Sequence, residues 1–306
     1  MSRSGTPADR GNTAALPLDG ADAVLPFVFE HEPVRGALVS LDVTWREVLA
    51  RRSYPAPLLP VMGEAMAAAA LLAGSMKLTG PLVLQLRGHG PLSLLVVECG
   101  AELGMRATAK WRANLQAPLL DMIGDGRFVI TLNSGQGQQA YQGVVAGEGE
   151  TLADMLEHYM GTSEQVATRL WLAADETRCS GLFLQRLPRA ADDDETWRRA
   201  TILAGSLRAG ELLRESSSAL LRKLFHEETL RVFSSRPTQF RCNCGRPRVG
   251  DMLRALGRDE VEDIVREQGQ VEVACDFCNQ AYRFDPVDVA QLFATESTAA
   301  PSATKH

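Results

Sequence analysis

Four of the six cysteines in this chain lie in two close pairs near its C-terminal end. Cys242 and Cys244 belong to the stretch RCNCG, and Cys275 and Cys278 belong to ACDFC. Two pairs of thiolates are the usual donors of a structural zinc site, because each pair spans one edge of a tetrahedron. Soft thiolates favour zinc over magnesium or calcium. The spacing therefore predicts one zinc ion with these four cysteines as its metal ligands.

A site of this type can be inert or reactive, and the residues leave both readings open. Four-thiolate zinc sites are more often structural than reactive. Two features favour reactivity here. A disulfide between Cys242 and Cys244 would close a very small ring with poor geometry, so it would be easily reduced. The site also concentrates thiolate, which is the oxidisable form of cysteine.

Small elements must bring the two pairs together. The 30 residues between Cys244 and Cys275 contain two apolar helical patterns, which end at Gly257 and Gly269. A short strand is expected at 270–275, and Asp285 with Pro286 predicts the cap and first residue of a last helix. Helices this short could scarcely bury a stable core alone, so we expect a metal to organise them.

The first two thirds of the chain predict one α+β domain built on an antiparallel sheet. Apolar runs of β type alternate with turn residues, and an Ala-rich, Leu-rich and Met-rich stretch predicts a buried helix. The expected strands cover 24–30, 34–45 and 168–174, the expected hairpins cover 81–99 and 127–147, and the expected helices cover 62–76 and a segment capped by Thr151.

The stretch 188–228 predicts a charged helical connector. Its apolar positions Trp197, Leu203, Leu207 and Leu213 lie near one helical face. The connector also contains Gly205 and Gly210, and each glycine costs about 1 kcal/mol of helix stability relative to alanine. We therefore expect the connector to depend on packing against a neighbour.

Composition excludes several classes of partner. The chain has 306 residues, 45% of them hydrophobic, and a formal net charge of -6, which disfavours nucleic acid. The stretch 241–296 holds 7 arginines, no lysine and 11 acidic residues, which argues against a nucleic-acid-binding zinc ribbon. The apolar window 66–76 is shorter than the 18 to 20 or so residues of a membrane span. The first residues lack the apolar core of a signal peptide, so we expect a cytoplasmic protein with no membrane partner.

No catalytic constellation is apparent, and we expect no enzyme activity. The histidines have no serine or cysteine partner at a recognisable spacing. Cys99 ends an apolar strand and is interpreted as a buried small hydrophobe, whereas Cys179 is expected in a polar loop as an incidental thiol. A thiol-disulfide oxidoreductase is the alternative function, but its Cys-X-X-Cys should open a helix, and here it follows a short strand.

Several long stretches together resemble one known family, the redox-regulated 33 kDa chaperonin, heat shock protein 33. The most specific are the cysteine pattern with its long gap and the segment from Ser163 to Leu170, SEQVATRL. The resemblance runs from about Val24 to Phe293 and is carried by the stretches 60–98, 130–145, 152–174, 220–233, 240–249 and 275–289.

This resemblance implies an ATP-independent holdase that is inactive when reduced and zinc-bound. Oxidants would form disulfides within each pair, Cys242 with Cys244 and Cys275 with Cys278, and expel the metal. The C-terminal domain would then unfold, the linker would loosen, and apolar surface would bind unfolded client proteins under oxidative stress. Whether activation also brings a homodimer stays open.

The domain organisation expected from the sequence and the resemblance has five parts. They are a disordered tail at 1–21, an α+β core domain at 22–190, a helical linker at 191–240, a zinc-binding redox-switch domain at 241–296, and a second disordered tail at 297–306.

Overall fold

The structure is a computed structural model, and it describes residues 22–112, 115, 118–132, 141–146, 149–188 and 195–294. Several expectations lie outside the described residues. These are the two tails, the turn of the second hairpin at 133–140, and the first part of the connector at 189–194.

The described chain forms two large sheets and one small one, where the sequence predicts a single sheet. In the first large sheet every pair of strands is antiparallel, and two short strands pair one after the other with the same edge of β1. In spatial order its strands are β10 (Leu230–Val232), β1 (Ala23–Phe29), β2 (Val34–Leu41), β9 (Cys179–Arg186) and β8 (Thr168–Ala174), with β11 (Arg236–Pro237) paired to β1.

The second large sheet contains both predicted hairpins. Its pairs are antiparallel except that β12 runs parallel to β5 at the edge. In spatial order its strands are β12 (Gln239–Phe240), β5 (Gly104–Trp111), β4 (Leu92–Cys99), β3 (Leu82–Arg87), β6 (Arg127–Leu132) and β7 (Tyr141–Ala146).

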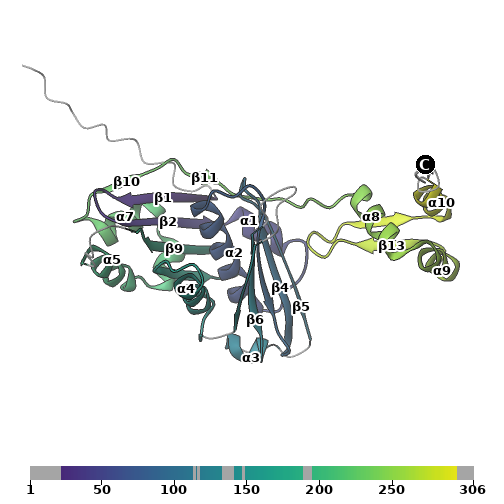
Figure 1. The fold of residues 1–306 in the computed structure, drawn as a ribbon, viewed down its shortest axis with the longest axis horizontal. Helices are drawn as coiled ribbons and strands as arrows, with labels where there is room; N and C mark the ends of the chain where they lie inside the picture. The colour runs from purple at the N-terminus through teal and green to yellow at the C-terminus, as the bar shows by residue number, and fades with distance from the viewer. Residues whose placement is uncertain are drawn as a thin grey trace, which may run out of the picture.

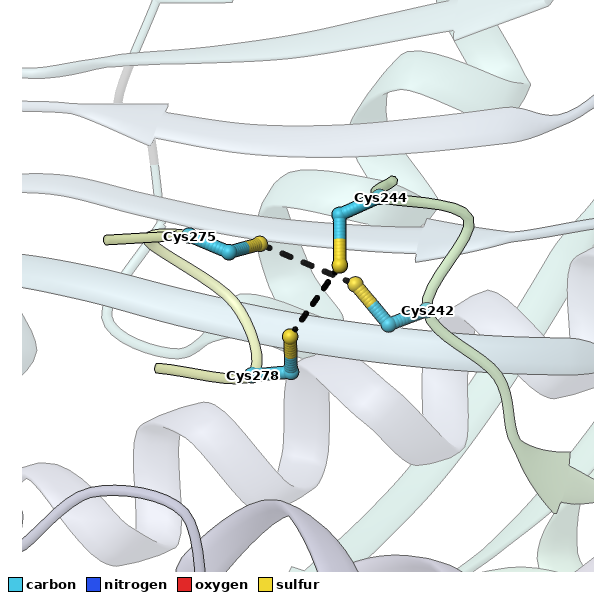
Figure 2. A group of neighbouring side chains, drawn as sticks. All are labelled: Cys242, Cys244, Cys275 and Cys278. Atoms are coloured by element: carbon cyan, nitrogen blue, oxygen red, sulfur yellow. Dashed lines mark hydrogen bonds between the residues drawn. The ribbon is translucent and has the colours of Figure 1, made fainter. Parts of the chain in front are cut away.

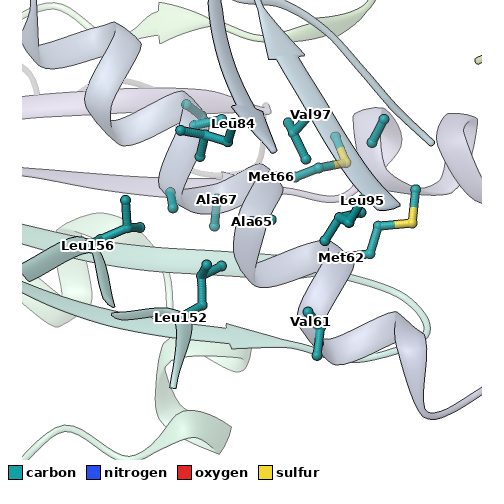
Figure 3. Packing of buried hydrophobic residues seen from close by; sticks show 14 of the residues in the cluster. Val61, Met62, Ala65, Met66, Ala67, Leu84, Leu95, Val97, Leu152 and Leu156 are labelled. Atoms are coloured by element: carbon teal, nitrogen blue, oxygen red, sulfur yellow. The ribbon is translucent and has the colours of Figure 1, made fainter. Parts of the chain in front are cut away.

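The predicted buried helix, α2 (Leu58–Ser75), lies between the two sheets (Figure 1). Figure 3 shows its Met62 and Met66 beside Leu95 and Val97 of β4. On the opposite side Gly63 lies so close to β8 that an added Cβ would meet the Cβ of Ala174 at 2.4 Å. The helix has 18 residues, more than the window that the sequence suggested, and is long and apolar enough to cross a membrane, but 72% of it is buried in the protein. This helix therefore belongs to the core of the protein.

One predicted strand is wrong in its last four residues. The run 34–45 was expected to be β throughout, but β2 ends at Leu41 and α1 (Val43–Leu49) follows. The Asp22 carboxylate accepts hydrogen bonds from the backbone N–H groups of Asp42 (2.7 Å), Val43 (3.0 Å) and Thr44, and so satisfies the start of the helix. Trp45 is fully buried, which fixes the helix against the core.

Both predicted hairpins and the predicted cap of α4 are confirmed. The hairpins β3–β4 and β6–β7 pair as expected. Thr151 caps α4 (Leu152–Thr162), since its hydroxyl accepts the Asp154 N–H at 3.1 Å and the Asp154 carboxylate accepts the Thr151 N–H at 3.0 Å. One more short helix, α3 (Leu119–Ile123), lies beside the β3–β4 turn.

The helical part of the connector packs on the first sheet, on the face opposite α2. It comprises α5 (Glu195–Gly205), α6 (Ala209–Arg214) and α7 (Ser217–Phe225). Its buried side chains join those of β1, β2, β8 and β9 in a separate apolar cluster. Phe225 contacts Phe27 and Phe29 with ring centroids 6.0 and 5.1 Å apart. Gly205 is the last residue of α5 and Gly210 is the second residue of α6, so neither glycine lies in the interior of a helix as the sequence suggested.

The expected helical linker is not helical throughout. After α7 the chain adds β10 and β11 to the edge of the first sheet, then β12 to the edge of the second. These strands have two or three residues each. The segment therefore spans both sheets before it reaches the first cysteine pair.

Residues 241–294, here called the C-terminal unit, lie apart from both large sheets, with the turn of a hairpin directed at β5 (Figure 1). The elements follow the predictions, with α9 ending at Gly269 in the left-handed conformation and Asp285 accepting the Asp288 N–H at 2.8 Å. They are α8 (Arg246–Leu256), α9 (Arg258–Gln268), β13 (Val271–Ala274), β14 (Ala281–Phe284) and α10 (Pro286–Ala294). The core of the unit is small, and its buried apolar residues are Leu253, Val261, Val271, Phe284, Val289 and Phe293.

Candidate metal centre

The four predicted cysteines come together at one point (Figure 2). Their Sγ atoms all lie within 4.8 Å of one another. The Cys242 and Cys275 sulfurs are 3.7 Å apart, and the Cys244 and Cys278 sulfurs are 3.3 Å apart. Four thiolates about 2.3 Å from a central zinc would be about 3.8 Å from one another. The donor set and its dimensions therefore fit a tetrahedral zinc site.

Two turns hold the sulfurs in place. The first pair lies between β12 and α8, where the Arg248 guanidinium donates to the Asn243 carbonyl at 3.1 Å. The second pair lies in the turn between β13 and β14, here called the CXXC turn (Cys275–Cys278). The Asn279 N–H donates to the Cys275 carbonyl at 2.9 Å, and Asn279 has a φ of 58°, the left-handed backbone that an asparagine tolerates.

Two side chains outside the pairs donate to the sulfurs. The Arg106 guanidinium of β5 lies 3.6 Å from the Cys242 Sγ, and the Tyr282 hydroxyl of β14 lies 3.1 Å from the Cys244 Sγ. Donors of this kind orient metal ligands and adjust how strongly they bind. The core sheet therefore contributes directly to the surroundings of the candidate metal centre.

The surroundings of the clustered thiols give them different pKa values. Burial opposes ionisation of Cys242, but the Cys244 N–H and the Arg106 guanidinium outweigh it and lower the pKa of Cys242 to about 7. Burial raises the pKa of Cys275, and it raises that of Cys278 to about 12 with help from hydrogen bonds to the neighbouring thiols. The hydrogen bond to Cys244 raises the pKa of the Tyr282 hydroxyl to about 12. Of Cys242, Cys275 and Cys278, Cys242 ionises most readily.

The CXXC turn rests on β5. The Thr108 hydroxyl donates to the Asp276 carbonyl at 2.7 Å, and the Lys110 ammonium lies 3.0 Å from the Asp276 carboxylate. The Arg106 guanidinium stacks over the Phe277 ring at 4.1 Å. Its position is set from the other side by Glu98 of β4, whose carboxylate accepts from its Nε at 3.2 Å and its Nη2 at 2.6 Å.

The remaining two cysteines are not part of this cluster. Cys99 is fully buried, as predicted, and burial raises its pKa to about 12. The prediction for Cys179 is wrong. It is the first residue of β9 rather than a loop residue, it is fully buried, and burial raises its pKa well above the ordinary value. Its side chain faces Gly63 of α2, so it packs as a core residue.

Comparison with known proteins agrees with this arrangement of sheets, helices and cysteines. The family model described as Hsp33 protein matches residues 22–285, a span that includes all four clustered cysteines. The chain belongs to the Hsp33 protein family. Similar members include the 33 kDa chaperonin of Methylobacillus flagellatus, 48% identical over 90% of this chain and 96% of that protein, and that of Chromobacterium violaceum, 46% identical over 93% and 98%. The resemblance inferred from the sequence is thus confirmed.

A solved Hsp33 structure has the same fold. The crystal structure of the 33 kDa chaperonin (heat shock protein 33 homologue) from Thermotoga maritima superposes with a TM-score of 0.80 and covers 90% of this chain and 99% of its own. The two sequences are 20% identical, so this likeness concerns the fold alone.

The sequence did not point to the neighbours of the cysteines. Arg106, Thr108 and Lys110 alternate along β5, so a two-residue period places them on one face of the strand. That period was available from the sequence. Nothing local, however, indicated that a turn more than 160 residues later, around Asp276, would lie on this face.

Proposed function

We propose that this chain is a redox-regulated, ATP-independent holdase that binds unfolding proteins after oxidation. The observation that carries the proposal is the cluster of four cysteine sulfurs at metal-binding distance in a unit with a very small apolar core. Membership of a family named for chaperonins supports it. The proposal includes a division into a core at 22–190, a linker at 191–240 and a switch at 241–296.

In the reduced protein, Cys242, Cys244, Cys275 and Cys278 are proposed to bind one zinc ion as thiolates. Zinc held in this way would supply a cross-link worth about 10 kcal/mol or more of folding free energy. The six buried side chains of the C-terminal unit offer little to replace that contribution. The fold of this unit is therefore proposed to depend on the thiolates staying reduced.

Oxidation would remove the donors. Two thiolates lose two electrons to form one S–S bond, and a peroxide takes up those electrons with two protons to give two waters. We propose this reaction within each pair, Cys242 with Cys244 and Cys275 with Cys278, so two peroxides are consumed per chain. The sulfurs of each pair lie within 4.8 Å of each other in the reduced cluster. Disulfide sulfurs no longer hold the metal.

Unfolding of the C-terminal unit would then destabilise the linker. The chain from β10 to β12 is attached to the sheets through strands of two or three residues, and α5 to α7 are short. Segments with few backbone pairings open at low free-energy cost. We propose that their release exposes the apolar face of the first sheet, which carries Leu25, Phe27, Leu182 and Leu184, to client proteins.

The test follows metal and client together. The reduced, zinc-loaded chain is treated with hydrogen peroxide at mild heat, and released zinc is measured with a colorimetric chelator while free thiols are counted. Light scattering of a heat-labile client is recorded in parallel without ATP. We expect release of one zinc per chain and suppression of scattering. Unchanged client aggregation after full zinc loss would refute the proposed function.

The proposal places the protein in the cytoplasm, with unfolded proteins as partners and without catalytic activity, nucleic acid or membrane binding. The alternative, a thiol-disulfide oxidoreductase, predicts catalytic turnover of insulin disulfides. The Cys-X-X-Cys lies in the turn after β13 instead of at a helix N-terminus, so it lacks the helix dipole that activates such thiols. Turnover in the insulin assay would favour the alternative.

A further inference from the structure

Strand β5 carries the side chains that bond the C-terminal unit to the core. Two hydrogen bonds, one ion pair and one ring contact join this strand to residues 241–294. The side chains involved on that strand are Arg106, Thr108 and Lys110, here called the β5 docking site. One backbone bond, from the Arg241 N–H to the Met105 carbonyl at 2.8 Å, leads the chain into the unit. The position of the redox centre on the core thus depends on a few polar contacts.

The geometry of Arg106 is set on three sides. Glu98 holds one edge of its guanidinium, Cys242 lies 3.6 Å from its Nη1, and Phe277 covers its face at 4.1 Å. Its side chain is only 11% exposed. A planar guanidinium with five donors suits this combination of carboxylate, sulfur and ring, which an ammonium group could not match. The arrangement is therefore a built contact and not a chance surface pairing.

The charges at this contact change with the state of the cysteines. A zinc ion with four thiolates carries a net charge of 2 − 4 = −2, which attracts the guanidinium of Arg106 and the ammonium of Lys110. Two disulfides carry no charge. Cysteine oxidation does not alter the carboxylates that face these cations, which belong to Glu98 and Asp276. Oxidation therefore removes the part of the attraction that belongs to the centre itself.

We propose that the β5 docking site is an electrostatic sensor through which the core binds the reduced centre and releases the oxidised one. Arg106 is its main positioning residue, since it contacts both cysteine loops, the first at the Cys242 sulfur and the CXXC turn at the Phe277 ring. This inference rests on the proposed function and adds a direct link between the cysteines and the core sheet, separate from the linker.

The test compares the full-length, zinc-loaded chain with Arg106→Gln. The matched control is Arg87→Gln, because Arg87 lies on the same face of the same sheet and bonds to Gln85 instead of the C-terminal unit. Zinc transfer to a colorimetric chelator is timed, and hydrogen exchange is followed in β5 and in the CXXC turn. We expect about tenfold faster transfer in Arg106→Gln, the lower end of the usual effect of removing a ligand's outer partner. Exchange should rise in both segments, and the control should match the unaltered chain.

A second pair of variants tests the β5 docking site independently, in case Arg106→Gln does not fold. Lys110→Glu and Asp276→Lys should each speed zinc transfer, and the double variant should be slower than either single one, because it restores an opposite-charge pair. Two results would refute the proposed sensor. One is zinc transfer and hydrogen exchange in Arg106→Gln equal to those of the unaltered chain. The other is zinc transfer in the double variant as fast as in the single variants.

The two proposals fail separately. If peroxide releases zinc and raises exchange in β5 but the client still aggregates, the proposed function fails and the sensor stands. If the client is protected but β5 exchange does not change on oxidation, the sensor fails and the holdase stands.

Discussion

The docking of the linker on the first sheet can be tested by Phe225→Ala. Phe225 is the last residue of α7 and is 2% exposed. Its ring packs at 72° to that of Phe29, with centroids 5.1 Å apart, and lies 6.0 Å from that of Phe27. These contacts join the linker to β1, so their removal should loosen α7 while leaving the core between the two sheets intact.

The magnitude follows from the burial. Truncating a buried phenylalanine to alanine costs about 3–5 kcal/mol, a range that includes the cavity left behind. Because about 1.4 kcal/mol corresponds to a factor of ten, even the lower value raises the undocked population of α7 about 10²-fold. The reduced, zinc-loaded variant should therefore suppress client aggregation partly without oxidant.

The assay combines hydrogen exchange with light scattering of a client. Amides of α7 and β10 should exchange about 10²-fold faster in Phe225→Ala than in the unaltered chain, and those of β3 and β4 should not change. The control is Ile202→Ala, since Ile202 belongs to the same linker but is 67% exposed. A substitution of this kind should change stability by less than about 0.5 kcal/mol.

Two results would refute the reasoning. Exchange in α7 within twofold of the unaltered chain would show that Phe225 does not hold the linker. Equal acceleration in α7, β3 and β4 would show that linker and core open together, so that the linker is not a separately released segment.

Three further outcomes are expected. Cys275→Ser should leave the purified chain with well under one zinc and raise hydrogen exchange in α8 to α10 while the core keeps its melting temperature, as zinc analysis and exchange will show. Asp22→Ala should lower the free energy of unfolding of the core by about 1–2 kcal/mol in urea titrations, because the first turn of α1 loses its acceptor. Burial raises the pKa of Glu64, which borders the cavity beneath α6, from 4.5 to about 7, so the charged form is disfavoured in the fold and stability is lost as pH rises through that range. Glu64→Gln should accordingly be about 3 kcal/mol more stable than the unaltered chain above pH 7 and lose that advantage near pH 4, and equal urea midpoints at pH 8 would contradict the assignment.

Local chemistry in the sequence was sufficient for much of the fold and for the ligand set. The pairs at Cys242 and Cys275 have a spacing that limits them to a few kinds of site. Thr151 and Gly269 mark helix ends because caps satisfy backbone groups within a few residues. The hairpin β3–β4 follows from a glycine turn between apolar runs.

Long-range contacts decided the rest, because their free energy comes from partners distant in sequence. Residues 43–45 favour a strand by composition, yet Asp22 caps them as a helix and burial of Trp45 stabilises that choice. Strands as short as β11 and β12 carry no periodicity and exist only through pairing with β1 and β5. The contact between Arg106 and Cys242 likewise joins residues 136 positions apart, and only the tertiary fold brings them together.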